Sequence, residues 1–214
     1  MRVSPALTAS LICGLAAAAC HSASSVAPPP TIIQPGAPGQ PSRTISAADA
    51  SDLSAVRHTA ADVAFMQGMI AHHAQALEMT ALLRTRTERD DMRRMAERID
   101  ISQTDEIGMM RTWLRARGED VPDEHAHHAH ERMPGMLTAE QMERLASSRG
   151  APFDRLFLEG MIAHHQGALT MVADLLKQPG AGQASDVFEF AADVEADQRM
   201  EISRMAAMLQ EMSR

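Results

Sequence analysis

Apolar residues recur every three to four positions over four long stretches of the chain. This spacing is typical of amphipathic helices, each with one apolar face. The expected long helices cover residues 60–86, 88–117, 153–177 and 185 to near the C-terminus, and a short helix covers 138–147. Ala, Met, Leu, Glu and Arg are abundant and Tyr is absent, which also favours helices over sheets. The pattern therefore predicts an all-α protein.

Residues with known roles at helix ends mark the expected boundaries. Thr59 is a candidate N-cap, and Asp62 follows it three residues later as in a capping box. Thr138 and Ser185 are candidate caps for later helices, and Gly118 is a stop signal. We also expect Asp62 and Asp154 to be acidic residues of a first helical turn, where the helix dipole favours negative charge.

The chain carries the same helix–loop–helix unit twice. The segment Phe-x-x-Gly-Met-Ile-Ala-His-His at 65–73 recurs at 157–165, an offset of 92 residues. Further on, Glu106 within an otherwise apolar stripe recurs as Glu201, an offset of 95. A doubled helical hairpin predicts a four-helix bundle with approximate two-fold symmetry. Repeat one should cover 59–118 and repeat two 151–214, joined by a His-rich linker at 119–150.

The N-terminal region reads as a secretory leader followed by a tether. Arg2 precedes an apolar stretch too short to span a membrane, which predicts a signal peptide at 1–19. Ala17-Ala18-Ala19-Cys20 resembles a lipobox, with Ala17 where Leu is usual, so Cys20 is the expected lipidation site. Simple cleavage after an A-x-A pattern is the alternative. Residues 20–58 are rich in Pro, Ala and Ser, and we expect a disordered, extended tether.

Charge and cysteine content exclude some functions. The formal net charge of -8 lacks the basic footprint of a nucleic-acid-binding protein. Because Cys13 lies in the expected leader, the mature chain would hold only Cys20. Neither an internal disulfide nor a thiolate metal site is then expected.

The repeated Met-His segment carries the candidate chemistry. Met69 precedes His72 by three residues and His73 by four, so either pair can meet on one helical face. The same spacing joins Met161 to His164 and His165. Thioether and imidazole together suit copper, Cu(I) above all. Adjacent helical residues point about 100° apart, so one histidine of each pair should face the bundle and the other a groove or a partner.

Two other interpretations of this segment remain open. In the first interpretation, the methionines only fill the core, and the histidines form hydrogen bonds to Glu106 and Glu201 across the bundle. In the other, the bundle is a di-metal carboxylate protein, although these helices lack the Glu-x-x-His motif of such sites. The linker holds a separate histidine cluster that suits Cu(II) or Zn, unless it is a solvated loop: His125, His127, His128 and His130.

The doubled Phe-x-x-Gly-Met-Ile-x-His-His-x-x-Ala-Leu-x-Met pattern, with Gln-x-x-Glu-Ile downstream, resembles the family called domain of unknown function 305. The resemblance covers about residues 62–212. It implies a periplasmic or extracellular helical bundle similar to ferritins, with copper binding and resistance in some members. Carried over by position, the metal-binding residues would be Met69, His72, His73, Met79, Met161, His164, His165 and Met171.

Together these features predict a periplasmic, lipid-anchored protein of the outer membrane that sequesters or hands over copper without turnover. Glu106 and Glu201 would orient the imidazoles. Its partners would be the metal ion, the membrane through the anchor, and either a second copy or a copper-transfer protein. The alternatives are a ferritin-like di-metal enzyme and a structural envelope bundle without metal.

Overall fold

The computed structural model of the 214-residue chain describes residues 31–34, 41–51, 58–122 and 133–214. The chain divides into two compact units, Met1–Asp52 and Leu53–Arg214. The expected signal peptide, Cys20 and the four linker histidines lie outside the described residues, so these calls stay predictions. No helix among the described residues is both long and apolar enough to cross a membrane.

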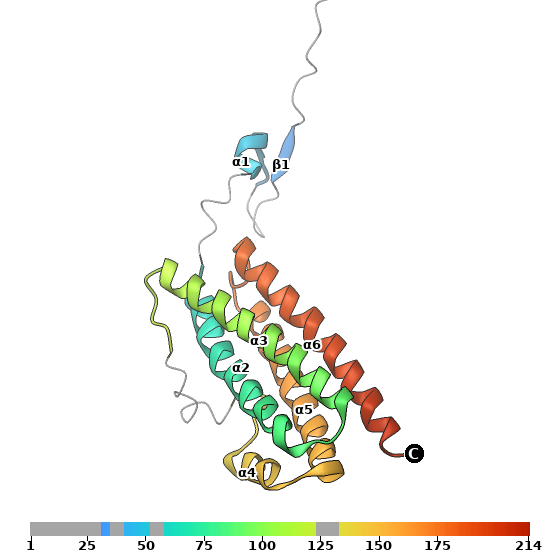
Figure 1. Ribbon diagram of the computed structural model, residues 1–214. Coiled ribbons are helices and arrows are strands. Elements are labelled where there is room, and N and C mark those ends of the chain that lie inside the picture. Colours follow the sequence, from blue (N-terminus) through green and yellow to red (C-terminus); the bar gives the residue numbers. More distant parts are fainter. Residues whose placement is uncertain (1–30, 35–40, 52–57, 123–132) are drawn as a thin grey trace, which may run out of the picture. The chain divides into compact units, whose positions relative to one another are not determined.

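The first unit contains a small antiparallel sheet and one short helix (Figure 1). Strand β1 (Ile32–Gln34) pairs with β2 (Arg43–Ile45), placing Ile32 opposite Ile45. Helix α1 (Ala47–Ser51) follows. The expectation of a wholly extended, disordered tether is wrong for these residues. The β-branched residues Ile32 and Ile33 in β1, and Thr44 and Ile45 in β2, favour a pleated ladder. The Pro-rich composition concealed this local preference.

The second unit consists of the expected helices (Figure 1). They are α2 (Ala60–Arg86), α3 (Asp90–Ala116), α4 (Ala139–Ser147), α5 (Gly150–Lys177) and α6 (Ser185–Glu211). The predicted Thr59–Asp62 capping box is confirmed. Thr138 caps α4 as predicted, and it does so in a capping box with Gln141. Ser185 is not a cap: Ala184 holds that position without a side-chain bond, and Ser185 is the first helical residue.

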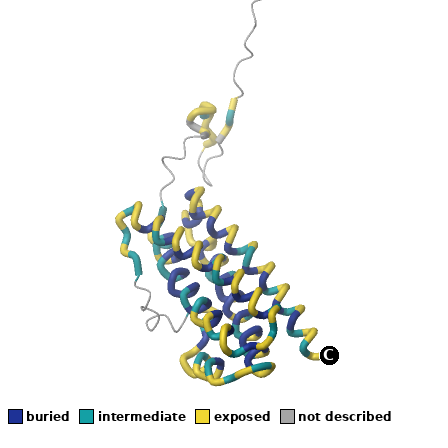
Figure 2. Tube along the Cα trace, viewed as in Figure 1, coloured by how far each residue is buried: buried dark blue, intermediate teal, exposed yellow. Residues whose placement is uncertain are grey.

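The helices pack as two hairpins, α2 with α3 and α5 with α6, and α2 also packs against α5. Buried positions line the inner faces of these helices and exposed positions the outer faces (Figure 2). Two apolar clusters make the core. One gathers Phe65, Trp113 and Phe190, and the other contains Phe153 and Phe157. The four-helix bundle with doubled hairpins is thus confirmed.

Residues 133–137, which we call the strap, run between α2 and α5 just before α4. The Gln75 side chain donates to Leu137 O (2.9 Å) and accepts from Leu137 N (2.8 Å). Gly167 lets the strap approach the helix, because a Cβ there would lie 1.9 Å from Pro134 O. Gly135 has a φ of +76°, a conformation that favours glycine. The strap therefore fits only where both glycines stand.

Candidate metal centre

All four histidines of the repeated segment are buried. His72 and His73 lie on α2, and His164 and His165 on α5, each with at most 1% of its surface exposed. The expectation that one histidine of each pair faces outward is wrong. Because α2 packs against α3 on one side and α5 on another, two directions about 100° apart both lead into the protein.

One histidine of each pair bonds to a glutamate of its own hairpin. His73 Nε2 donates to Glu106 Oε2 on α3, and His165 Nε2 donates to Glu201 Oε2 on α6 (2.6 Å). The Ser102 hydroxyl donates to the other oxygen of Glu106 (3.0 Å). The repeat thus produces the same imidazole–carboxylate pair twice, and the expected bonding of the histidines to Glu106 and Glu201 is confirmed.

The other two histidines stack on each other between α2 and α5. The ring centroids of His72 and His164 are 3.8 Å apart and the planes are tilted by 37°. His164 Nε2 bonds to His72 O (2.9 Å), whereas His72 Nε2 bonds to Pro134 O of the strap (3.0 Å). The two-fold symmetry of the repeats therefore ends at this pair, where the strap replaces the second inter-helix bond.

The hydrogen bonds and burial define the protonation of this stacked pair. Burial lowers the pKa of His72 from 6.5 to about 3, with further lowering by His73 and His165 that outweighs the bond to Pro134. Burial and the neighbouring histidines likewise hold the pKa of His164 well below 6.5. Both rings are therefore neutral near pH 7. Because a carbonyl oxygen only accepts, each Nε2 carries the proton and each Nδ1 is a bare lone pair.

The Nδ1 atoms have no partner. In the described residues, Nδ1 of His72, His73, His164 and His165 is buried and makes no hydrogen bond. A histidine whose one ring nitrogen donates to a carboxylate or carbonyl, leaving the other nitrogen free, has the arrangement of a metal-ligating imidazole. Buried polar atoms are nearly always satisfied, so unpartnered nitrogens at matched positions of both repeats require an explanation.

The four rings do not converge as a ready-made cage. In the part of the chain that the structure describes, no group of three or more His, Cys, Asp or Glu side chains is arranged to hold a metal ion. An imidazole lone pair lies in the ring plane, so the two stacked rings do not aim at one point between them. A shared ion would require one ring to turn, and each Nδ1 otherwise needs a partner of another kind, such as a thioether.

The candidate methionines lie in the core. Met69, Met79 and Met161 are fully buried, and Met171 is partly buried. Met69 belongs to one apolar cluster, whereas Met79 and Met161 belong to the other. The two Gly-Met-Ile segments therefore supply thioethers to different parts of the bundle. Their role as ligands stays a prediction beside the core-filler interpretation.

The second methionine of each repeated segment, Met79 or Met171, packs against the other copy of the repeat. A Cβ on Gly160 would lie 3.3 Å from Met79 Cε, and one on Gly68 would lie 3.4 Å from Met171 Cε. Each repeat thus packs its second methionine against the glycine of the other repeat. The glycine of each Gly-Met-Ile segment thus lies in a packing contact that involves no metal.

The two repeated aspartates differ. Asp62 lies in the first turn of α2 and accepts from Gly182 N (2.7 Å), so it ties α2 to the loop before α6. Asp154 is buried, but the first turn of α5 contains no acid. The expectation for Asp154 is wrong because α5 begins at Gly150, three residues before the predicted start. Its Oδ1 has no hydrogen-bond partner among the described residues.

Asp197 is a site residue that the sequence reasoning missed. It occupies the position that Ser102 holds in the first repeat, one turn before Glu201. Burial, then Glu106, Glu201 and Asp193, raises the pKa of Asp197. The signal available in the sequence was the mismatch between Ser102 and Asp197 within otherwise matched segments.

Comparison with known proteins assigns the fold to a family. The model of the family described as "Domain of unknown function (DUF305)" matches residues 62–209, more than half of the chain. The chain belongs to the DUF305 family. No protein with a curated description matches this DUF305 chain.

Solved structures of DUF305 proteins resemble the chain over the bundle. A DUF305 fragment from Deinococcus radiodurans is 31% identical with a TM-score of 0.63, covering 72% of this chain and 98% of its own. A putative secreted DUF305 protein from Streptomyces coelicolor is 29% identical with a TM-score of 0.63, covering 72% and 94%. CopM in its Cu(I)-bound form is 25% identical with a TM-score of 0.56, covering 70% and 96%.

CopM has also been solved in other metal states. The Cu(II)-bound form is 27% identical to this chain with a TM-score of 0.54, covering 70% of this chain and 96% of its own. An Ag-bound form is 25% identical with a TM-score of 0.54 and the same coverage. Relatives of this DUF305 protein thus include one that binds copper and silver.

Proposed function

We propose that this DUF305 protein binds copper outside the cytoplasm and sequesters it or hands it to a partner, without catalytic turnover. Two findings support the proposal. CopM, which shares the fold at 25 to 27% identity, has been solved with Cu(I), Cu(II) and Ag bound. The second is the set of four buried imidazoles whose Nδ1 atoms lack partners, and this observation carries the proposal for the present chain.

The proposed ligands are the Nδ1 atoms of the buried histidines, with Met69 and Met161 as neighbouring thioethers. Neutral imidazole and thioether both suit Cu(I), and neither must lose a proton at neutral pH to bind it. Glu106 and Glu201 would act through their bonds to His73 and His165 by fixing which nitrogen carries the proton. The linker histidines would form a separate, looser Cu(II) or Zn site.

The proposed location rests on the leader and the relatives. One structural relative is a putative secreted protein, which agrees with the signal peptide expected at 1–19. We also propose that Cys20 is lipidated and that the lipid anchors the protein in the outer membrane.

Metal analysis of the mature protein, purified without a His tag, tests the function. We expect Cu(I) to bind and survive competition by a Cu(I) chelator. Paired iron or manganese would instead support a di-metal carboxylate protein, and no metal would support a structural bundle. Replacing the four linker histidines with Gln should remove Cu(II) binding and leave Cu(I) binding.

A double variant and a matched control test whether the core histidines bind Cu(I). Replacing His72 and His164 with Gln keeps a donor for Pro134 O and His72 O but removes the bare Nδ1. Cu(I) affinity should fall by about tenfold or more. The control is His58→Gln, because His58 is partly exposed and pairs with Glu119 (3.5 Å) at the start of α2. Unchanged Cu(I) affinity in the double variant would show that the core histidines are structural.

A further inference from the structure

Three methionines meet two unpaired carboxylates in a groove between α3 and α6. We call it the thioether groove. It has a volume of about 230 Å³, and its wall includes Met66 from α2, Met109, Met110 and Trp113 from α3, and Glu189 and Asp193 from α6. No residue of the repeated Met-His segment other than Met66 lines it. The contacts around the histidines therefore do not account for this groove.

The three methionines of the groove lie at different depths, from the surface to the core. Met109 is 51% exposed, whereas Met66 and Met110 are buried in the core at 1% and 0%. Met66 lies three residues before Met69 and seven before His73 on α2, and Met110 lies one turn after Glu106 on α3. Because residues three or four apart are neighbours on a helix, the groove is within two turns of the His73–Glu106 pair on both helices.

The charge of the groove is negative and partly unbalanced. Asp186 at one end is already engaged, because it accepts from Trp113 Nε1 (3.1 Å), pairs with Arg117 and accepts from Val187 N (2.9 Å). Glu189 and Asp193 are exposed, and neither has an ion-pair partner within the described ranges. Two carboxylates next to three thioethers can therefore offset the charge of a bound cation.

The carboxylates continue toward the histidines. Asp193, Asp197 and Glu201 follow one another at intervals of four residues, so they share one face of α6. Glu201 ends this series by accepting from His165. The raised pKa of Asp197, to which Asp193, Glu106 and Glu201 contribute after burial, agrees with their proximity.

We propose that the thioether groove is a capture site for Cu(I), which it passes to the buried histidines. The proposal deepens the proposed function and rests on it. Thioether sulfur selects a soft cation such as Cu(I) or Ag(I) over Mg²⁺ or Ca²⁺, which prefer oxygen ligands. The carboxylates attract the cation and offset its charge, and buried Met66 and Met110 place sulfur on the route to His73.

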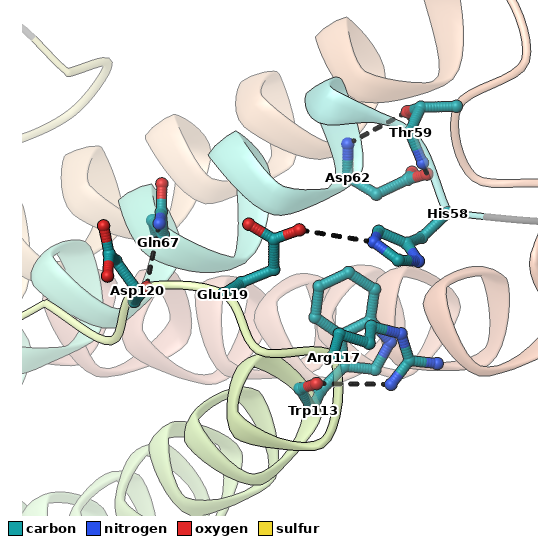
Figure 3. Close-up of polar contacts among 8 residues, drawn as sticks. All are labelled: His58, Thr59, Asp62, Gln67, Trp113, Arg117, Glu119 and Asp120. Atoms are coloured by element: carbon teal, nitrogen blue, oxygen red, sulfur yellow. Dashed lines mark hydrogen bonds and ion pairs between the residues drawn. The ribbon is translucent and has the colours of Figure 1, made fainter.

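Trp113 makes the groove observable. It is the only Trp of the chain, and Tyr is absent, so its fluorescence reports on the groove alone. Figure 3 shows its ring between His58 and Arg117 at the end of α3: the His58 ring is 5.3 Å away edge-on, and the Arg117 guanidinium lies 4.2 Å above the ring. The indole is thus held in one orientation beside the thioethers.

The test titrates Ag(I), a redox-inert substitute for Cu(I), into the metal-free mature protein in chloride-free buffer. Trp113 emission and the NMR signals of 13C-labelled methionine methyls are followed together. We expect emission to change and the Met66, Met109 and Met110 methyls to shift. Replacing these three with Leu, which keeps size and apolarity, should weaken the Ag(I) affinity reported by Trp113 by about tenfold or more.

Controls separate the groove from the rest of the protein. Met200→Leu changes an exposed methionine of α6 outside the groove and should leave the titration unchanged. Met109→Leu alone alters an exposed position, so weaker Ag(I) binding there would support the groove even if the triple variant folds poorly. Replacing Glu189 with Gln together with Asp193 with Asn should weaken Ag(I) binding. This weakening should be larger at low salt than at high salt, because salt screens exposed charges.

The outcomes also distinguish this proposal from the proposed function. If silver binds while Trp113 emission and the three methyls stay constant, the groove is not a capture site and the copper-binding function stands. If neither silver nor Cu(I) binds anywhere in the chain, both proposals are overturned.

Discussion

The buried, neutral state of His72 predicts that the metal-free bundle loses stability in mild acid. In the unfolded chain this imidazole has its usual pKa of 6.5, whereas burial lowers the folded value to about 3. At pH values between these two pKa values, His72 is protonated in the unfolded state and neutral in the folded state. Stability present above pH 6.5 is therefore lost progressively as the pH falls toward 3.

The magnitude follows from the linkage relation. One proton bound only by the unfolded state changes the free energy of unfolding by about 1.4 kcal/mol per pH unit, so His72 alone costs about 2 kcal/mol between pH 6.5 and pH 5. His164, whose pKa is also held well below 6.5, acts in the same direction. Such a loss is a large fraction of the 5 to 15 kcal/mol that stabilises a typical domain.

Urea unfolding of chelator-treated protein at pH 7, 6 and 5, followed by circular dichroism, measures this loss. His72→Gln cannot titrate and keeps a donor for Pro134 O, so its stability should fall by about 2 kcal/mol less than wild type over this range. Met200→Leu, an exposed change without a titratable group, should retain the wild-type pH dependence. If His72→Gln and wild type lose stability equally, His72 is protonated or exposed in the folded state. Its Nδ1 would then not be the buried, unprotonated ligand that we propose.

Two further predictions concern the N-terminal region. Labelled palmitate should enter the wild type and not Cys20→Ser; an unlabelled wild type released as a soluble protein would refute lipidation. Deleting residues 21–51 should leave the melting temperature of the bundle nearly unchanged, because this segment lies wholly within the separate unit Met1–Asp52. A large drop would show that it stabilises the helices.

The helices and the His–Glu pairs could be predicted because the sequence encodes them locally and twice. Apolar spacing placed α2 at 60–86, and the Thr59–Asp62 capping box fixed its start. Glu106 and Glu201 were recognisable as polar residues in apolar stripes at matched repeat positions. Where a local signal was absent the prediction failed: the start of α5 carries no side-chain cap, and its true start removes Asp154 from the first turn.

The stacked histidines and the strap could not be predicted, because they depend on a contact between segments far apart in the chain. Periodicity gives the face of a residue and not its partner, so it could not show that both faces of α2 are covered. The strap has no periodic pattern of its own. The single available signal was a break in the repeat, since Gln75 in the first copy corresponds to Gly167 in the second. Both residues serve the strap: one bonds to it and the other makes room for it.

Gly167→Ala tests whether the strap keeps the histidine pair buried. The new Cβ would lie 1.9 Å from Pro134 O and 2.7 Å from Gly135 Cα, so backbone must move. We expect a net loss of about 1 to 3 kcal/mol from overpacking, although Ala favours a helix over Gly by about 1 kcal/mol. Gly108→Ala is the matched control: it lies within α3 with nothing inside 4 Å of the new Cβ, so it should gain stability.

The same substitution links the strap to the chemistry of His72. A displaced strap no longer accepts from Nε2, and it lets water reach the ring. Because burial is the largest cause of the low pKa of His72, that pKa should rise from about 3 toward 6.5, which NMR titration of the ring protons would show. A destabilised Gly167→Ala protein whose His72 still fails to titrate above pH 5 would mean that α2 and α5 alone bury the imidazole. The strap would then be a packing element with no control over access to the histidines.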